Sequence, residues 1–394
     1  MPGSVIVAGA RTPIGKLSGA FAGFTAMDLG GFAIAAALER AGVTPEQVEY
    51  VFMGQVLQAG QGQITARQAA VKAGIPMTVP ATTVNKVCLS GLNTIHLADL
   101  AIQAGEADII VAGGMESMTR APHLLPEARA GYRLGDGKLV DSMMHDGLFC
   151  AFDVCAMGAG TEKYTKAAGT ISRDQQDAFA ANSHERASAA MKEGRFADEI
   201  VNVEVPQRKG DPVVVDTDEG VRPGTTTDTL GKLKPAFEAD GTITAGNASQ
   251  ISDGGAAVIV MSRAKADQLG VTPLGEVVSY GQVAGPDPSL LTQPSRASKL
   301  AMDKAGIGVS DVDLFEFNEA FAAVGLASMA DLGVGEDVTN VNGGAIALGH
   351  PIGMSGTRLA LTILHELKRR GGGTGVAALC GGGGQGDAIV LRTI

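Results

Sequence analysis

The sequence predicts an α/β protein made of two duplicated halves, with a segment of different character inserted in the first. Residues 38–51 and 302–315 match at a constant offset of 264 residues, with similar side chains at most positions. Each segment ends a helical pattern at Ala-Gly, turns and enters an apolar strand. Unrelated α/β units can look alike, but one register kept over the whole segment favours duplication.

Further pairs of segments extend the repeat. Residues 83–85 resemble 340–342, and Ser90 and Ser355 each precede a glycine and open a long helical pattern. Residues 107–114 resemble 375–382, because each is a short apolar strand that ends in two glycines. Alternating strands and helices predict two largely parallel or mixed sheets with helices on their faces, related by a pseudo-twofold axis.

The length of 394 residues suits two or three domains. We expect an N-terminal half at 1–119, an inserted segment at 120–248 and a C-terminal half at 271–394. The apolar run 251–261 should return to the first sheet, so that about 249–270 completes the first half. The insertion begins rich in Pro and Gly and contains a polar helical pattern near 172–194.

Composition excludes several classes of protein. The formal charge is −11 and no basic stripe offsets it, so nucleic acid is not an expected partner. No apolar run reaches the roughly 18 residues of a membrane span, and neither a signal peptide nor a peroxisomal address is recognised, so a cytoplasmic location is expected. The four cysteines form no CxxC pair, which predicts free thiols and no metal site.

Cys88 is the first candidate for chemistry. It lies in residues 85–91, where a strand gives way to a helix. A helix N-terminus is expected to lower the pKa of the thiol and favour thiolate. The alternative is a buried cysteine that acts as a small apolar side chain.

His350 lies in residues 342–356, a stretch with five glycines that must fold tightly. The alternative is a turn histidine bonded to backbone. By the repeat, this loop takes the place in the second half that the Cys88 loop takes in the first. The pseudo-twofold axis should therefore bring His350 and Cys88 to one spot.

Cys380 ends an apolar strand and is followed by glycines at 381–384, which leave the backbone accessible to a ligand. A nucleotide-binding loop is not expected there, because a second strand at 388–391 follows instead of a helix and no Gly-Lys-Ser is present. Asn318 follows a strand of the second half, where it can also cap a helix.

These motifs together resemble the thiolase family. Residues 318–321, 342–356 and 380–386 are similar to its three C-terminal signatures, residues 85–91 to its nucleophile loop, and residues 11–15 also match. The resemblance covers essentially the whole chain. It implies a thiolase-like fold, with two βαβαβαββ halves in five α-β-α-β-α layers and a coenzyme A-binding loop domain at 120–248.

The resemblance implies an acetyl-CoA C-acetyltransferase that joins two acetyl-CoA molecules reversibly into acetoacetyl-CoA, in fatty acid metabolism. A cysteine suits this chemistry, because passing an acyl group between thiols is nearly isoenergetic. Cys88 would carry the acyl group, His350 would take its proton, and Cys380 would remove the α-proton.

Two oxyanion sites are implied. His350 and a water held by Asn318 would form one, and the N–H groups of Cys88 and Gly382 the other. No cofactor is expected beyond the coenzyme A thioesters, which are substrates. Arg222 can alternatively be a solvated surface arginine. The implied contacts to coenzyme A are Leu148, Met157, Arg222, Phe237, Ser249, Ala320 and Phe321.

Two departures from the family leave the acyl-chain preference open. Ala156 stands where many biosynthetic members carry histidine, and residues 291–294 replace a Met-Gly-x-Gly-Pro stretch. We expect a pocket closed for short chains by Met157, Leu291, Met354 and Phe321.

Three alternatives to this function remain. They are a degradative thiolase for longer 3-ketoacyl-CoA, a decarboxylating ketoacyl synthase, and a non-catalytic lipid- or nucleotide-binding protein on the same fold. A synthase is disfavoured, because such enzymes carry histidine or asparagine where Cys380 stands. The resemblance also implies a homo-oligomer, a dimer or a tetramer, with 122–143 similar to the loop that pairs dimers.

Overall fold

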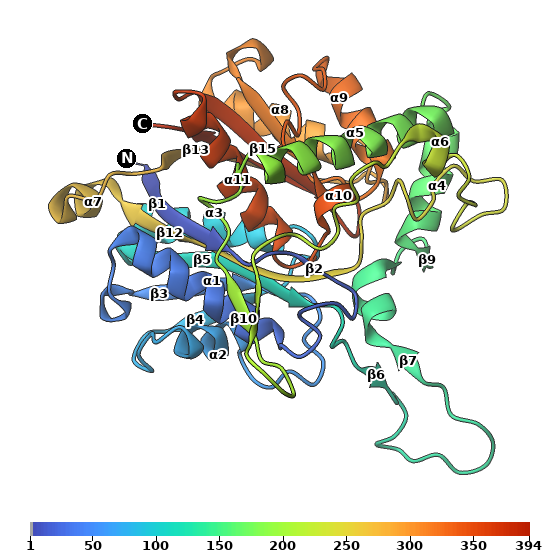
Figure 1. Cartoon of the computed structure of the whole chain (residues 1–394), viewed down its shortest axis with the longest axis horizontal. Coiled ribbons are helices and arrows are strands. Elements are labelled where there is room, and N and C mark those ends of the chain that lie inside the picture. The colour runs from blue at the N-terminus through green and yellow to red at the C-terminus, as the bar shows by residue number, and fades with distance from the viewer. Residues whose placement is uncertain (1–2) are drawn as a thin grey trace.

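The large sheet of the protein, described for residues 3–394 by a computed structural model, has a five-stranded first half and a four-stranded second half (Figure 1). The first half orders its strands β4 (Ala81–Val84), β3 (Tyr50–Gly54), β5 (Ile109–Ser117), β12 (Ser252–Ser262) and β1 (Ser4–Arg11). The second orders β14 (Leu314–Phe317), β15 (Thr374–Gly381), β16 (Gln385–Arg392) and β13 (Gly275–Ala284). Only Val5–Glu276 and Ile6–Gly275 join the two sheets, through β1 and β13.

The strand pairing confirms the duplication. In the first half β3 runs parallel to β4 and β5, and β12 and β1 follow antiparallel. In the second half β14 runs parallel to β15, followed by antiparallel β16 and β13. A parallel bridge from Phe315 to Thr339 occupies the place of β4 and supplies the fifth position. As the apolar run 251–261 predicts, β12 lies between β1 and β5, and β2 (Gly15–Lys16) pairs with its start.

The repeat keeps its offset in three dimensions. α1 (Ala26–Ala41) and α8 (Gln293–Ala305) end at Gly42 and Gly306, which are both left-handed, with φ of 64° and 69°. Short 3-10 turns follow at Pro45–Gln47 and Val309–Asp311, before β3 and β14 begin. Glycine suits both helix ends because it adopts positive φ without strain.

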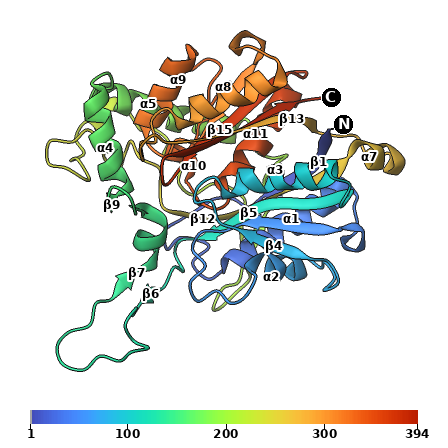
Figure 2. The same cartoon turned by 180° about the vertical axis from the view of Figure 1, so that it is seen from behind.

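Helices complete five layers, as predicted. α3 (Ser90–Gln103) and α11 (Ser355–Arg369) pack against each other between the two sheets. α1 and α2 (Thr65–Lys72) cover the outer face of the first sheet, while α8 and α9 (Ala322–Leu332) cover that of the second (Figures 1 and 2). α7 (Arg263–Leu269) connects the halves.

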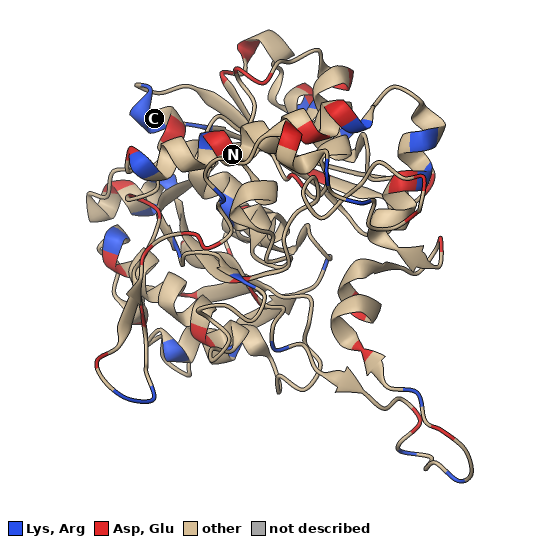
Figure 3. Cartoon of the chain, turned by 45° about the vertical axis from the view of Figure 1, so that its right-hand side comes forward, with Lys and Arg blue, Asp and Glu red and all other residues tan. Residues whose placement is uncertain are grey.

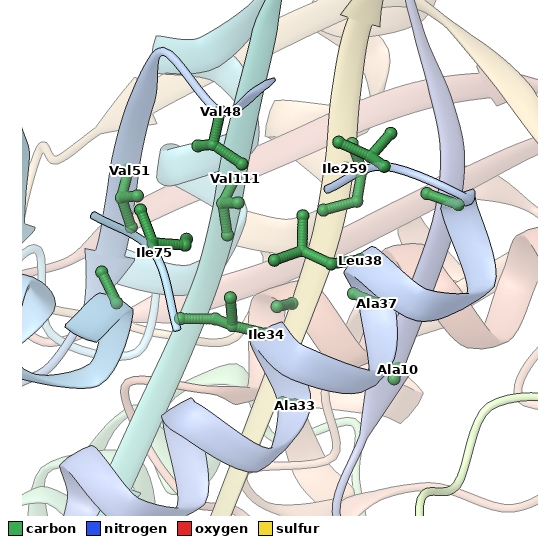
Figure 4. Close-up of a cluster of buried hydrophobic side chains, with 14 of the residues drawn as sticks. Ala10, Ala33, Ile34, Ala37, Leu38, Val48, Val51, Ile75, Val111 and Ile259 are labelled. Carbon is green, nitrogen blue, oxygen red and sulfur yellow. The ribbon is translucent and has the colours of Figure 1, made fainter. Parts of the chain in front are cut away.

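Alternation along the strands divides the core between the layers. Ile34 and Leu38 of α1 pack with Val111 and Ile259 on the outer side of the first sheet (Figure 4). The adjacent residue on β5, Ile110, belongs to the cluster around the central helices. Successive side chains of a strand point to opposite faces, so each strand of this sheet contributes to two apolar layers.

The segment between β5 and β12 lies along one side of both halves. β6 (His123–Leu124) pairs with β7 (Val140–Asp141) at the base of a loop that projects away from the body (Figures 1 and 2). A π-helix at Met143–Leu148 and the hairpin β8 (Phe149–Cys150) and β9 (Cys155–Ala156) lead into α4 (Met157–Ala168). The division at 120–248 stays a prediction. The remaining elements are α5 (Arg173–Lys192), β10 (Val203–Val205), β11 (Val213–Val215), α6 (Thr227–Leu230) and, in the second half, α10 (Ala345–Leu348).

A buried arginine fixes this segment to the first sheet. Arg11 at the end of β1 is fully buried and bonds Glu199 and Asp218, each at 2.7 Å. Asp218 also accepts the N–H of Ile14. A guanidinium without these carboxylates would be costly to bury, so the contact sets where residues 199–218 lie.

Lys and Arg positions are interspersed with Asp and Glu positions along the ribbon in Figure 3. Across residues 3–394, no helix has the length and apolar character needed to cross a bilayer. The same residues contain no cluster of three or more His, Cys, Asp or Glu that could hold a metal ion.

Candidate active site

Loops of both halves enclose a cavity of about 50 Å³. Nine of the residues singled out in the sequence line it, which confirms that the repeat brings Cys88 and His350 to one place. The lining residues are Val87, Cys88, Gly147, Leu148, Met157, Ser249, Leu290, Ala320, Phe321, His350, Ile352, Cys380 and Gly382.

Cys88 lies in a tight turn that is stabilised by hydrogen bonds from side chains. Val87 has a φ of +51°, which a β-branched residue rarely adopts. The Val87 N–H donates to Asn85 Oδ1 at 3.0 Å, and Ser90 Oγ donates to the Val87 carbonyl at 2.6 Å. These contacts hold the strained Val87 in place directly before Cys88, and α3 begins two residues after Cys88.

Cys88 is a neutral thiol near pH 7. Burial raises the pKa of Cys88 to about 12, while the backbone N–H groups of Cys88 and Gly382 act in the opposite direction. The sequence-based expectation of a lowered pKa and a preformed thiolate is therefore wrong. Desolvation outweighs the N–H groups, so any reaction of this thiol as a nucleophile requires a base to take its proton.

His350 has the form that such a base requires. Ser355 Oγ donates to the Pro351 carbonyl at 3.0 Å, so the 2.6 Å contact between His350 Nδ1 and Ser355 Oγ carries its proton on Nδ1. The lone pair is then on Nε2. Burial, aided by the Arg358 cation, lowers the pKa of His350 to about 3, so the imidazole is neutral at pH 7.

Asn318 lies behind His350 and does not line the cavity. It is fully buried, and its Nδ2 lies 3.3 Å from His350 Nε2. Its Oδ1 has no hydrogen-bond partner among residues 3–394. A buried amide oxygen without a partner is costly, so Asn318 Oδ1 is available to accept a hydrogen bond beside His350.

Cys380 lies near the end of β15 and pairs with Gly386 of β16, and Gly382 begins the turn between these two strands. Burial, together with the neighbouring Cys88, raises the pKa of Cys380 above its ordinary range. A Cβ on Gly382 would lie 3.3 Å from Val87 Cγ1, a tighter contact than most side chains accept. Glycine at 382 therefore lets the backbone N–H approach the turn that contains Val87 and Cys88.

A larger cavity of about 270 Å³ adjoins the first and shares six lining residues with it. Of the implied coenzyme A contacts, Leu148, Met157, Phe237, Ser249 and Phe321 line it, whereas Ala320 lines only the small cavity. Phe237 meets Phe321 edge to face, with ring centroids 6.4 Å apart. The result is a mostly apolar passage towards Cys88. The shared residues are Leu148, Met157, Ser249, Phe321, His350 and Ile352.

Three predicted residues lie elsewhere. Arg222 is exposed and lines neither cavity; its guanidinium reaches Gln250 Oε1 at 3.4 Å, and Gln250 lines the larger cavity. Met354 packs in a separate core cluster and Leu291 beside the site, so the expectation that they close the acyl pocket is wrong. Leu290 lines the small cavity instead. The turn before α8 that contains Leu290 and Leu291 has no periodic pattern from which the direction of its side chains could be predicted.

Comparison with known proteins decides the family. Residues 4–264 match the family model described as "Thiolase, N-terminal domain", and residues 271–393 match "Thiolase, C-terminal domain". The chain belongs to the thiolase family. The predicted thiolase-like fold is confirmed, and the chain is an acyltransferase of this family.

Relatives match this thiolase over nearly its whole length. It is 59% identical to a probable acetyl-CoA acetyltransferase of Mycolicibacterium smegmatis over 98% of this chain and 100% of the relative. Acetyl-CoA acetyltransferases of Cupriavidus necator and Pseudomonas aeruginosa are 54% and 53% identical, each over 98% of both chains.

Proposed function

We propose that this thiolase is an acetyl-CoA C-acetyltransferase, which condenses two acetyl-CoA into acetoacetyl-CoA and coenzyme A and also runs in reverse. The observation that carries this is the meeting of Cys88, His350, Cys380 and the Gly382 N–H around one small cavity at the end of an apolar passage. The names of the relatives support the same substrate. The enzyme would work in the cytoplasm, on coenzyme A thioesters, without a further cofactor.

In the first half-reaction, Cys88 Sγ attacks the thioester carbon and His350 Nε2 takes the thiol proton. The N–H groups of Cys88 and Gly382 hold the oxygen as it becomes negative, and each such donor is worth about 3 kcal/mol. The carbon–sulfur bond to coenzyme A breaks, and the departing thiolate takes a proton from Cys380. The acetyl group is then on Cys88, with a Cys380 thiolate and a His350 imidazolium.

In the second half-reaction, the Cys380 thiolate removes the α-proton of a second acetyl-CoA. The enolate oxygen is held by the imidazolium of His350 and a water bound to Asn318, whose free amide oxygen supports this role. The enolate carbon attacks the acetyl group, the Cys88 thioester breaks, and Cys88 regains the proton from His350. All three groups return to their starting states.

The size of the small cavity supports a short acyl group. A volume of about 50 Å³ has room for roughly three to five water-sized groups, at about 10–15 Å³ each. An acetyl group fits that space, whereas a longer chain would have to displace Leu148, Leu290 or Phe321. A degradative thiolase for longer chains is therefore the second choice.

We further propose a homo-oligomer in which coenzyme A binds along 120–248. The projecting loop supports assembly, because Leu125, Leu134 and Leu139 are exposed on it to 50%, 101% and 60%. Apolar side chains on a protruding loop are typical of a contact surface. A tetramer formed through this loop from two dimers fits that pattern.

Brief exposure to acetyl-CoA, followed by tryptic digestion and mass spectrometry, tests the function. One acetyl group should appear on peptide 87–120, which contains Cys88 as its only cysteine. Label on peptide 139–163, which carries Cys150 and Cys155, would contradict the assignment. A chain that takes no label but still binds acetyl-CoA would support the non-catalytic alternative.

A further inference from the structure

The turn at residues 85–90, which presents Cys88 in the first half, is bonded to the second half by an ion pair outside the cavity. Lys86 Nζ lies 2.8 Å from both carboxylate oxygens of Asp387. Asp387 is fully buried, while the Lys86 side chain is 21% exposed. Tyr280 Oη also donates to Asp387 Oδ2, at 2.7 Å. The carboxylate thus has three short contacts, from β13 and from the turn.

Both ends of this ion pair are adjacent to groups assigned to the reaction. Lys86 precedes Cys88 by two residues, and its own N–H donates to Ser90 Oγ at 2.8 Å. Asp387 follows Gly386, the β16 residue that pairs with Cys380. The contact therefore fixes the Cys88 turn relative to the β15–β16 turn that carries Gly382.

That relation matters because the two N–H groups facing the Cys88 sulfur come from different halves of the chain. Among residues 3–394, the sheets of the two halves share two residue pairs, which lie on β1 and β13. The strained Val87 between Lys86 and Cys88 must also be held by its surroundings. The ion pair lies beside Cys88, so it can set the distance between the two N–H donors. The contact between β1 and β13 cannot.

Stability alone is a weak reason for this pair. Burial raises the pKa of Asp387, against the effects of Lys86 and Tyr280, so desolvation offsets much of the attraction. Replacing a partly buried ion pair by apolar groups is often neutral for stability. Neither Lys86 nor Asp387 lines either cavity, so neither contacts substrate.

We infer that Lys86 and Asp387 are a positioning pair, which holds the N–H groups of Cys88 and Gly382 at the spacing needed for the thioester oxygen. This inference rests on the proposed function and adds two residues to it. A misplacement of about 1 Å at such a site costs up to about 100-fold in rate. Loosening one of several contacts should cost roughly 10-fold.

The test compares Lys86→Met, Asp387→Asn and the double variant with wild type. Single-turnover acetylation of Cys88 is followed by mass spectrometry over a range of acetyl-CoA concentrations, and Tm is measured alongside. We expect each variant to acetylate roughly 10-fold more slowly, with half-saturation changed less than twofold, because the passage for coenzyme A is untouched. Lys299→Met serves as the control, since Lys299 pairs with Asp331 at 2.9 Å away from the site and should keep the wild-type rate.

The double variant separates positioning from stability. It removes both charges, so its Tm should recover relative to Lys86→Met while acetylation stays slow. Acetylation that recovers together with Tm, or an unchanged rate in Lys86→Met, would overturn the inference. A wild-type enzyme that does not acetylate Cys88 at all would instead refute the proposed function, and with it the reason for the pair.

Discussion

Leu290 is the side chain through which the acyl-chain preference can be tested most directly. It lines the small cavity but not the larger one, and it is 5% exposed. Leu290→Ala removes three carbon atoms from the wall of a cavity of about 50 Å³. The passage for coenzyme A keeps its shape, so the change acts on the acyl end of the substrate.

The expected gain follows from the methylenes that the new space admits. Each buried methylene contributes about 0.8 kcal/mol, so a substrate longer by two carbons gains about 1.6 kcal/mol in the variant. That corresponds to about a 15-fold rise in the ratio of kcat/KM for the six-carbon over the four-carbon 3-ketoacyl-CoA. Wild type should favour four carbons, react more weakly at six and do little beyond eight.

The assay is thiolysis of a 3-ketoacyl-CoA series by wild type, Leu290→Ala and Leu332→Ala. Leu332 is buried in the outer core of the second half, so its variant shares the 2–5 kcal/mol stability loss typical of such truncations without opening the cavity. An unchanged chain-length ratio in an active Leu290→Ala enzyme would refute the reasoning. A wild-type kcat/KM that rises through ten carbons would favour the degradative alternative.

Three further predictions concern the thiols, the pH dependence and the assembly. Cys380→Ala should still acetylate Cys88 but fail in thiolysis and condensation; near-normal thiolysis would exclude Cys380 as the base. Because burial raises the pKa of Cys88 to about 12 and lowers that of His350 to about 3, neither group changes protonation between about pH 5 and 9, and the acetylation rate should stay level there. A rate that rises up to about pH 8 and levels off above about pH 9 would instead show a thiol with an ordinary pKa. Light scattering should give a dimer or a tetramer, and Leu134→Ser with Leu125→Ser should shift a tetramer to dimers that remain active; a monomeric wild type would contradict the proposed assembly.

The features that the sequence predicts well are those that repeat or that depend on local backbone chemistry. The Ala-Gly ends of α1 and α8 mark helix termini because glycine adopts positive φ there, at Gly42 and Gly306. The match between 107–114 and 375–382 correctly places β5 and β15 in equivalent positions of the two halves. The repeat also equates the loops that carry Cys88 and His350, which correctly predicts that both residues line one cavity.

The features that escape prediction depend on what lies around a residue after folding. A helix start favours thiolate at Cys88, but the extent of its desolvation is set by side chains distant in sequence, and burial dominates. Leu290 and Leu291 are adjacent in an irregular turn, where no alternation tells which one faces a ligand. The contact of Lys86 with Asp387 spans 301 residues and has no local motif.

The limited contact between the sheets of the two halves has a consequence for synthesis of the chain. Gly382 follows Cys88 by 294 residues, so a ribosome releases the second N–H donor of the Cys88 sulfur long after Cys88 itself. Until β15 and β16 have folded onto the first half, the thiol lacks that donor. Under the proposed function, we therefore expect a chain that stops before β15 to present Cys88 without one of its two N–H donors and to be acetylated slowly.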